Sequence, residues 1–452
     1  MKNIILLLII SFSKYHFEET IFVFEHFRHG ARGPISYMSD NLTDSLKIYW
    51  GSIGEINKIG MKQHFLSGYQ KLKKYKNLLE DPFKVFCYTT NLNRTKISLK
   101  YHLLGIYNYS NILNISDYNK YYFIPKNIST FKNLNFNFDK TYDILKYSNV
   151  NENIKIKIFD SNKIKYRSKI CPYLKQIRKN NNLKAKNLYE NIIKNFNDKY
   201  LNKLKNYLNN NSFYFFSFKY LTRICDTYIS DYIYDQQIFH DKLKNLNFFE
   251  LYEDCINIMN ISMYNTYYVN DYNVVPIANN FIKIFYKYLK LAKKKNSIND
   301  NDYIKYVMFS GHDSSVASII MFFKFIFNNE INVKPFYPFF GTSLIIELNK
   351  KENDNNEYYI KCIVDDELFF EMNYNKFIKR FESYLMNDDE INNYCYNINN
   401  NILLNNRYLI VIIIFIILFF AIFICVLRCK KNNIKNNNDN NKNSQELEDK
   451  FI

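Results

Sequence analysis

The chain has 452 residues, of which 47% are hydrophobic, so it has enough apolar side chains for a large core and is not a disordered chain. Its formal net charge of +18 is compatible with nucleic acid, anionic membranes or phosphorylated substrates as partners. Because the lysines are dispersed among asparagines and aromatic residues, a solvated basic surface is the simpler interpretation, and we expect no nucleic-acid partner.

Residues 1–16 are predicted to be a secretory signal peptide. Lys2 stands before the apolar run 4–12, which provides the charged start and the short apolar core of such signals. The run is too short to cross a bilayer, and a buried first strand is the alternative interpretation.

A buried strand and a cationic loop are predicted next. Residues 20–27 are β-branched, aromatic and apolar, and they lead directly into residues 28–34, RHGARGP. The guanidinium groups of Arg28 and Arg32 match phosphate oxygens in pairs and stay charged at any pH, so the loop is suited to an anion. The imidazole of His29 can bind a phosphate or attack it as a nucleophile. A basic surface loop is the alternative interpretation.

The order of strand, loop and helix then repeats. Helical spacing of apolar residues over 57–76 is followed by a strand at 83–88, a loop that contains Arg94, and a second helical pattern. From about 131 to 295 helical periodicity dominates, and we interpret this region as an inserted, mostly α-helical domain.

The α/β pattern resumes after this insertion. A strand predicted at 303–310 runs into Gly311, His312 and Asp313, and an apolar helix follows. Further strands are predicted at 343–348 and 358–364. The fold class is therefore α/β, with a three-layer sandwich core from residues 17–130 and 296–395 and the α-helical insertion at 131–295.

The pair His312-Asp313 follows a buried strand, as the first loop does, so both are expected at the same edge of the sheet. Beside a bound phosphate the carboxyl of Asp313 holds its proton more tightly, because like charge disfavours the carboxylate. Such a group is suited to general acid catalysis in an acidic compartment. The alternatives are a histidine satisfied within the core and an aspartate that caps a helix.

A transmembrane helix is predicted near the carboxyl end. Residues 408–427 form about 20 uninterrupted apolar residues, with Arg407 before them and Arg428, Lys430 and Lys431 after them. The basic cluster places residues 428–452 in the cytosol. The chain is thus expected to be a single-pass type I membrane protein of a lysosome-like or vacuolar membrane or of the cell surface.

The eight cysteines agree with this topology. Cys425 and Cys429 lie at the inner membrane edge, where palmitoylation or no function is expected. The other six lie in an oxidising compartment, where disulfides are expected, and their spacing does not predict a zinc site. Sequons suggest a glycoprotein, although an asparagine-rich chain produces such matches by chance; they lie at Asn41, Asn108, Asn114, Asn127, Asn210 and Asn260.

The order of these motifs resembles the histidine acid phosphatases, the branch that contains prostatic and lysosomal acid phosphatases and many phytases. The resemblance extends from Thr20 to about Cys395. Residues 28–34 match the family's RHGxRxP, and residues 54–68 resemble its GxxQLTxxGxxQHxxLG segment. Residues 87–95 resemble its RSTDxxRT stretch, with Tyr88 and Asn91 in place of the first Arg and the Asp. Residues 311–313 resemble its terminal HD pair.

The resemblance implies a role for each matching residue. His29 is the expected nucleophile, which becomes a phosphohistidine, and Asp313 is the expected donor of the leaving-group proton. The phosphate oxygens are expected to be held by Arg28, Arg32, Arg94 and His312. No cofactor and no metal are implied, and the expected partners are phosphorylated small molecules or phosphoproteins. The resemblance also allows a homodimer.

The family's Cys-Pro pair suggests a disulfide between Cys171 and Cys395. A second pair, Cys225 with Cys255, is a further suggestion, and Cys87 and Cys362 have no assignment. The sequon at Asn93 overlaps Arg94, so we expect it to be unmodified, because a glycan there would cover the pocket.

The sequence thus predicts an acid phosphatase that hydrolyses phosphate monoesters on the lumenal or extracellular side of a membrane. One alternative is a catalytically inactive relative that binds phosphorylated ligands or acts as a surface protein, but every residue of the expected catalytic set is present. The other is phytase-like specificity. Residues 312–315, HDSS, resemble the HDTT form of the prostatic and lysosomal branch more than the HDTN form of bacterial phytases.

Overall fold

The computed structural model describes most of the chain and divides it into two compact units, residues 1–387 and 388–452. The sheet and the predicted site belong to the first unit, and α19 (Asp388–Tyr396) belongs to the second. The described residues are 18–35, 52–107, 154–159, 171–204, 217–234, 247–267, 274–298, 300, 302–327, 331, 337–351, 357–396 and 416.

A mixed β-sheet forms the centre of the first unit, and within the described residues it has seven strands in the order β3-β2-β4-β1-β5-β6-β7. Strands β3, β2, β4 and β1 are parallel, and β5, β6 and β7 continue the sheet in antiparallel pairs. The strands are β1 (Glu18–Arg28), β2 (Val85–Thr90), β3 (Lys155–Phe159), β4 (Tyr306–Gly311), β5 (Ser343–Lys351), β6 (Tyr358–Val364) and β7 (Glu367–Asn373).

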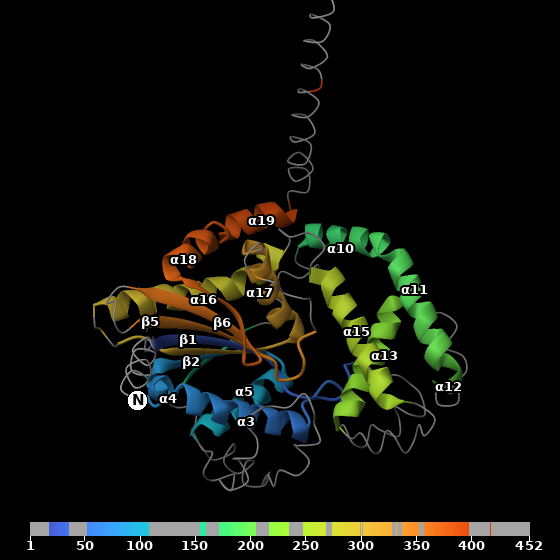
Figure 1. The fold of residues 1–452 in the computed structure, drawn as a ribbon, viewed down its shortest axis with the longest axis horizontal. Coiled ribbons are helices and arrows are strands. Elements are labelled where there is room, and N and C mark those ends of the chain that lie inside the picture. Colours follow the sequence, from blue (N-terminus) through green and yellow to red (C-terminus); the bar gives the residue numbers. More distant parts are fainter. Residues whose placement is uncertain are drawn as a thin grey trace, which may run out of the picture. The chain divides into compact units, whose positions relative to one another are not determined.

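Helices cover both faces of this sheet (Figure 1). One face carries α3 (Lys58–Lys74), α4 (Lys76–Leu79) and α5 (Asn93–Tyr107), and the other carries α16 (Val274–Ser297), α17 (Asp313–Ile326) and α18 (Tyr374–Glu382). The remaining helical elements are η1 (Pro82–Lys84), α10 (Pro172–Lys184), α11 (Lys186–Phe196), η3 (Asn197–Leu201), α12 (Asn202–Leu204), α13 (Phe218–Tyr234) and α15 (Phe248–Tyr267).

The alternating side chains of β1 explain why it is buried on both faces. Val23 and Phe27 belong to the apolar cluster that α4 and α5 complete. On the opposite face Phe24 packs against Phe285 of α16, with ring centroids 5.4 Å apart. The strand therefore lies between two helical layers, as expected for the buried strand that the sequence predicted.

One charged residue of β1 is also fully buried. The carboxylate of Glu25 accepts hydrogen bonds from the hydroxyls of Tyr306 (2.8 Å) and Ser343 (2.9 Å), and His102 lies 3.4 Å away. Burial alone would raise the pKa of Glu25, but His102 and Lys71 lower it to about 2. The network holds β1, β4 and β5 together beneath the ends of the strands that carry the site.

Two elements of the expected insertion belong to the sheet layers instead. β3 pairs with β2 in parallel at the edge of the sheet, and α16 packs on β1 and α17. The sequence of β3, KIKIF, is short and lies among polar residues, so its alternation is a weak signal. The helical periodicity of α16 is present, but its apolar face covers the sheet. β7 and α18 follow the last strand that the sequence predicted, and neither was identified from the sequence.

The predicted signal peptide, the tail and nearly all of residues 408–427 lie outside the described residues, as do Cys425, Cys429 and every predicted sequon except Asn260 and that of Asn93. Among the residues that are described, none of the helices combines the length and the apolar character needed to cross a bilayer.

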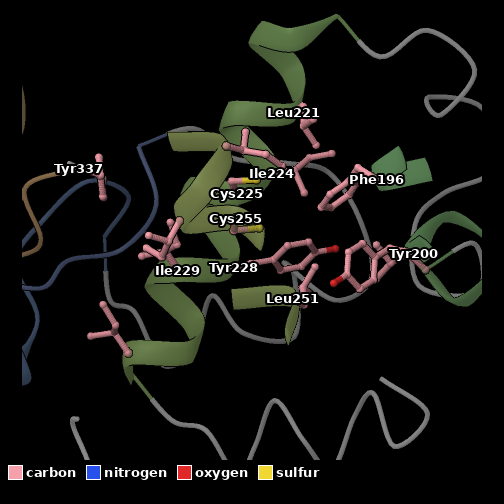
Figure 2. Close-up of a cluster of buried hydrophobic side chains, with 14 of the residues drawn as sticks. Phe196, Tyr200, Leu221, Ile224, Cys225, Tyr228, Ile229, Leu251, Cys255 and Tyr337 are labelled. Atoms are coloured by element: carbon pink, nitrogen blue, oxygen red, sulfur yellow. The ribbon is translucent and has the colours of Figure 1, made fainter. Parts of the chain in front are cut away.

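Cys171 and Cys395, the two members of the pair suggested by resemblance, are both disulfide-bonded. The suggested disulfide between Cys225 and Cys255 was wrong. These side chains lie within hydrogen-bonding contact, one on α13 and one on α15, but both are free thiols. Burial raises the pKa of Cys225 well above its usual value, so the thiol stays protonated in the apolar cluster shown in Figure 2.

Replacement of His64 is expected to weaken the acid sensitivity of the fold. Burial and then His102 lower the pKa of this histidine to about 3. Below pH 6.5 the unfolded chain takes up a proton at His64 and the folded chain does not, so stability falls as the pH falls toward 3. Between pH 7 and pH 5 this difference in proton uptake lowers the free energy of unfolding by about 2 kcal/mol.

Urea unfolding of His64→Gln at pH 7 and pH 5 should therefore show a drop in the free energy of unfolding that is about 2 kcal/mol smaller than that of the original chain. Equal drops in both proteins would mean that His64 is already protonated in the folded state or makes no difference to acid stability.

Candidate active site

The two predicted motifs meet because β1 and β4 are parallel neighbours. Arg28 at the end of β1 stands opposite Gly311 at the end of β4. The amide of His29 then donates to the carbonyl of Gly311 at 3.0 Å. His29 and His312 leave their strands side by side, with ring centroids 5.5 Å apart. The carboxyl edge of the parallel strands is where ligand sites of such sheets collect.

The loop after β1 is clamped against the start of α3. A Cβ atom on Gly30 would lie 2.4 Å from the carbonyl oxygen of Gly60, so only glycine permits this backbone contact. The amide of Asn57 donates to the carbonyl of Ala31 at 3.0 Å, and the side chain of Gln63 accepts from the amide of Ala31 at 2.9 Å. The segment 54–68 therefore serves to fix the loop.

The ring of His29 has a defined tautomer. Its Nδ1 lies 2.9 Å from the carbonyl oxygen of Gly30, and a carbonyl only accepts, so Nδ1 carries the hydrogen. Burial first, and then Arg28, Arg32, His312 and Arg94, lower the pKa of His29 well below its usual value. The neutral ring therefore leaves the lone pair of Nε2 available as a nucleophile.

In addition to burial, the positive charges of three guanidinium groups lower the pKa of His29. Arg28 and Arg32 are almost fully buried, and Arg94 at the start of α5 donates to the carbonyl of Gly54 at 3.4 Å. Burial and then Arg32 lower the pKa of Arg94 to about 10. Within the part of the chain that the structure describes, the Nε atom of each arginine is buried without a hydrogen-bond partner. Phosphate oxygens would satisfy such donors.

Arg28 is held by an aromatic segment that the sequence analysis did not identify. Its Nη2 donates to the hydroxyl of Tyr337 at 2.8 Å, and its Nη1 donates to the carbonyl of Pro338. The guanidinium carbon also lies 4.1 Å from the ring centroid of Phe340. The amide of Tyr337 in turn donates to the side chain of Asn260 on α15. The predicted sequon at Asn260 thus lies within a helix and helps to hold the site.

Asp313 begins α17 beside Arg28. Its Oδ2 lies 3.2 Å from Nη2 of Arg28, and its side chain is 19% exposed. His312 precedes the helix as its N-cap, and Ser315 completes a capping box. Nε2 of His312 lies 3.0 Å from the hydroxyl of Thr90 at the end of β2. The sequence offered Asp313 as a possible helix cap, but the N-cap of α17 is His312. Asp313 instead contacts Arg28.

A further residue, Asp226 of α13, joins this set. Its carboxylate pairs with Arg32, 2.8 Å from Nη2 and 3.2 Å from Nη1. Nothing in the sequence around Asp226 distinguishes it from other helical aspartates. All six predicted residues lie at the ends of β1 and β4 or at the start of α5; these are Arg28, His29, Arg32, Arg94, His312 and Asp313.

The family model described as "Histidine phosphatase superfamily (branch 2)" matches residues 13–365. The chain belongs to this superfamily. A segment of 93 residues is 30% identical to lysosomal acid phosphatase of Xenopus laevis and covers 20% of this chain and 21% of that protein. This match thus spans about a fifth of the relative's length.

The solved structure of one phytase shares the fold of this chain. The phytase from Citrobacter braakii superposes with a TM-score of 0.52 at 10% identity, over 82% of this chain and 98% of that one. The multiple inositol polyphosphate phosphatase of Bifidobacterium longum, in complex with inositol hexasulfate, gives a TM-score of 0.49 at 8% identity, over 78% and 88%.

Loss of the Tyr337 hydroxyl is expected to impair catalysis more than stability. Tyr337→Phe removes the bond to Arg28, and hydrogen bonds to charged groups contribute roughly 1.5–3 kcal/mol. We therefore expect kcat/KM for a phosphate monoester to fall about 10-fold or more.

Tyr303→Phe is a matched control, because it removes a buried hydroxyl that donates to Ile21 near the start of β1. If both variants lose the same amount of activity, the bond from Arg28 to Tyr337 has no specific role in the site.

Proposed function

We propose that this histidine phosphatase is an acid phosphatase that hydrolyses phosphate monoesters through a phosphohistidine on His29. The observation that carries the proposal is the neutral His29 ring, with Nδ1 bonded to Gly30 and Nε2 available, among buried arginines. Arg28, Arg32, Arg94 and His312 would hold the phosphate oxygens. The expectation that no metal or cofactor takes part remains a prediction.

In the first step Nε2 of His29 attacks phosphorus, the N–P bond forms and the ester P–O bond breaks in line with it. Asp313 delivers its proton to the departing alcohol oxygen. In the second step water attacks phosphorus, its proton passes to the Asp313 carboxylate, and the N–P bond breaks to release phosphate. The arginines are positioned to stabilise negative charge on the phosphoryl oxygens in both steps.

The Arg28–Asp313 contact of 3.2 Å suggests how the site changes when it is filled. With no anion bound, Arg28 stabilises the carboxylate. A phosphate dianion competes for the same guanidinium and repels the carboxylate, so Asp313 would bind its proton more tightly as the substrate enters. The general acid would thus become protonated when it is needed.

The electrostatics of His29 favour work at acidic pH. Because the pKa of His29 lies well below 6.5, the ring stays neutral and nucleophilic at pH values where an ordinary histidine is protonated. The rate should therefore not fall through His29 protonation near pH 6.5 as the solution is acidified.

We also propose that the enzyme faces the lumen or the exterior, as a type I membrane protein. The disulfide-bonded state of Cys171 and Cys395 supports an oxidising compartment. The apolar residues 408–427 support an anchor.

The nucleophile and the acid are expected to respond differently to substitution. His29→Ala should abolish turnover of every substrate, because no covalent intermediate can form. Asp313→Asn should slow an alkyl phosphate more than a nitrophenyl phosphate, since only the poorer leaving group needs protonation. General acids contribute about 10²–10⁴-fold.

The measurement is kcat/KM for both esters and for inositol hexakisphosphate from pH 4 to pH 7. An equal loss for both esters in Asp313→Asn would assign the proton to another group. A strong preference for inositol hexakisphosphate would favour phytase-like specificity, and no turnover of any ester by the original chain would favour the inactive alternative.

Truncation before Arg407 is expected to release an active protein from membranes, because residues 408–427 are then absent. The measurement is phosphatase activity in the soluble and membrane fractions of cells that express each form. Recovery of the truncated form in the membrane fraction alone would contradict the proposed anchor.

A further inference from the structure

Helix α13, which together with α15 is called the helical segment below, supplies a buried carboxylate to the loop after β1. Asp226 of α13 is 6% exposed and Arg32 is 1% exposed. The two side chains form two hydrogen bonds, from Nη2 to Oδ1 at 2.8 Å and from Nη1 to Oδ2 at 3.2 Å. Oδ2 also accepts from the amide of Ile35 at 2.9 Å. One carboxylate thus contacts the loop at two points.

The pairing with Asp226 uses the Nη1 and Nη2 atoms of Arg32. Nη1 also donates to the carbonyl of Gly33 at 2.8 Å, whereas Nε is buried without a hydrogen-bond partner among the described residues. A planar guanidinium bound at its end by a carboxylate can rotate little, so the orientation of the edge that carries Nε is fixed. A phosphate that binds this edge would find it already oriented.

The helix that carries Asp226 is itself anchored in a buried cluster. Cys225 and Ile229 of α13 pack with Cys255 and Leu251 of α15, as Figure 2 shows. Ala31 of the loop belongs to the same cluster, together with Tyr337 and Phe340. The apolar core of the helical segment is therefore continuous with the loop, and a shift of α13 would be transmitted to Arg32.

We propose that Asp226 is a positioning residue that orients Arg32 for the phosphoryl group of the transition state. This inference rests on the proposed function. Asp226 does not touch the reacting atoms in this role, because it acts through the guanidinium. Its negative charge lies close to the anion site and opposes ground-state binding of phosphate, so its contribution is to geometry and not to attraction.

The charges around Arg32 also distinguish a geometric role of Asp226 from an attractive one. Asp226 raises the pKa of Arg32 against the effect of burial, whereas Arg94, beside the same arginines, has its pKa lowered. A purely electrostatic partner and a positioning partner therefore predict opposite results. Removal of the charge alone would tighten phosphate binding, and loss of orientation would weaken the binding of a transition-state analogue.

The test is Asp226→Asn in the full chain, with kcat and KM for a nitrophenyl phosphate and with calorimetric affinities for inorganic phosphate and orthovanadate. Vanadate adopts the five-coordinate geometry of the transition state, and phosphate does not. We expect kcat to fall about 10-fold to 100-fold, as small misplacements of catalytic groups do. Vanadate affinity should fall at least 10-fold more than phosphate affinity, and Asp226→Glu should restore part of both.

Asp254→Asn is the matched control. Asp254 lies on the neighbouring helix α15 and accepts hydrogen bonds from Lys199 at 2.7 Å and Tyr200 at 2.6 Å, so this variant removes the same charge and also breaks an ion pair. It should leave kcat and both affinities within about twofold, and thermal unfolding should show both variants folded.

Three results would overturn the inference: kcat and vanadate affinity unchanged in Asp226→Asn, equal changes in Asp254→Asn, or a rise in both oxyanion affinities. If the original chain has no turnover, the proposed function fails, yet the two affinities still decide the role of Asp226.

Discussion

The parallel pairing of β1 with β4 is the interaction on which the site depends. Residues about 280 positions apart in the sequence become neighbours because Arg28 stands opposite Gly311 and His29 bonds to its carbonyl. His29 and Asp313, the proposed nucleophile and general acid, thus follow adjacent strands of one sheet. Backbone hydrogen bonds fix the register of the two strands that these residues follow. The buried Glu25 network beneath them ties the same two strands to β5.

Around this centre each neighbouring element restrains one part of the site. The start of α3 clamps the loop, the aromatic segment before β5 holds Arg28, and α13 holds Arg32. Buried cations repel one another, so each needs a partner or a stacking surface to remain in place without a ligand. The loop after β1 is therefore the point where the sheet, the helical segment and the aromatic segment meet.

The sequence predicted the parts of this arrangement that have strong local signals. β1, β4 and β6 were expected within a few residues of their bounds, because buried strands form continuous apolar runs. The resemblance to the histidine acid phosphatases named six candidate site residues, which the structure places near the ends of β1 and β4 and at the start of α5, and their roles stay a prediction. β3 was missed because alternating Lys and Ile at a sheet edge leaves few apolar residues to detect. Asp226 was missed because its role depends on a partner 194 residues away, and no local pattern records such a contact.

The four free thiols among the described residues allow the opening of the fold to be observed region by region. Cys87 and Cys362 lie within the sheet, and Cys225 and Cys255 lie between α13 and α15. Burial raises the pKa of Cys87, Cys225 and Cys362, so little reactive thiolate exists in the closed structure. Alkylation at each site must await a local opening event. The rates of labelling, resolved by mass spectrometry, would then report separately how often the sheet and the helical segment open, without any engineered probe.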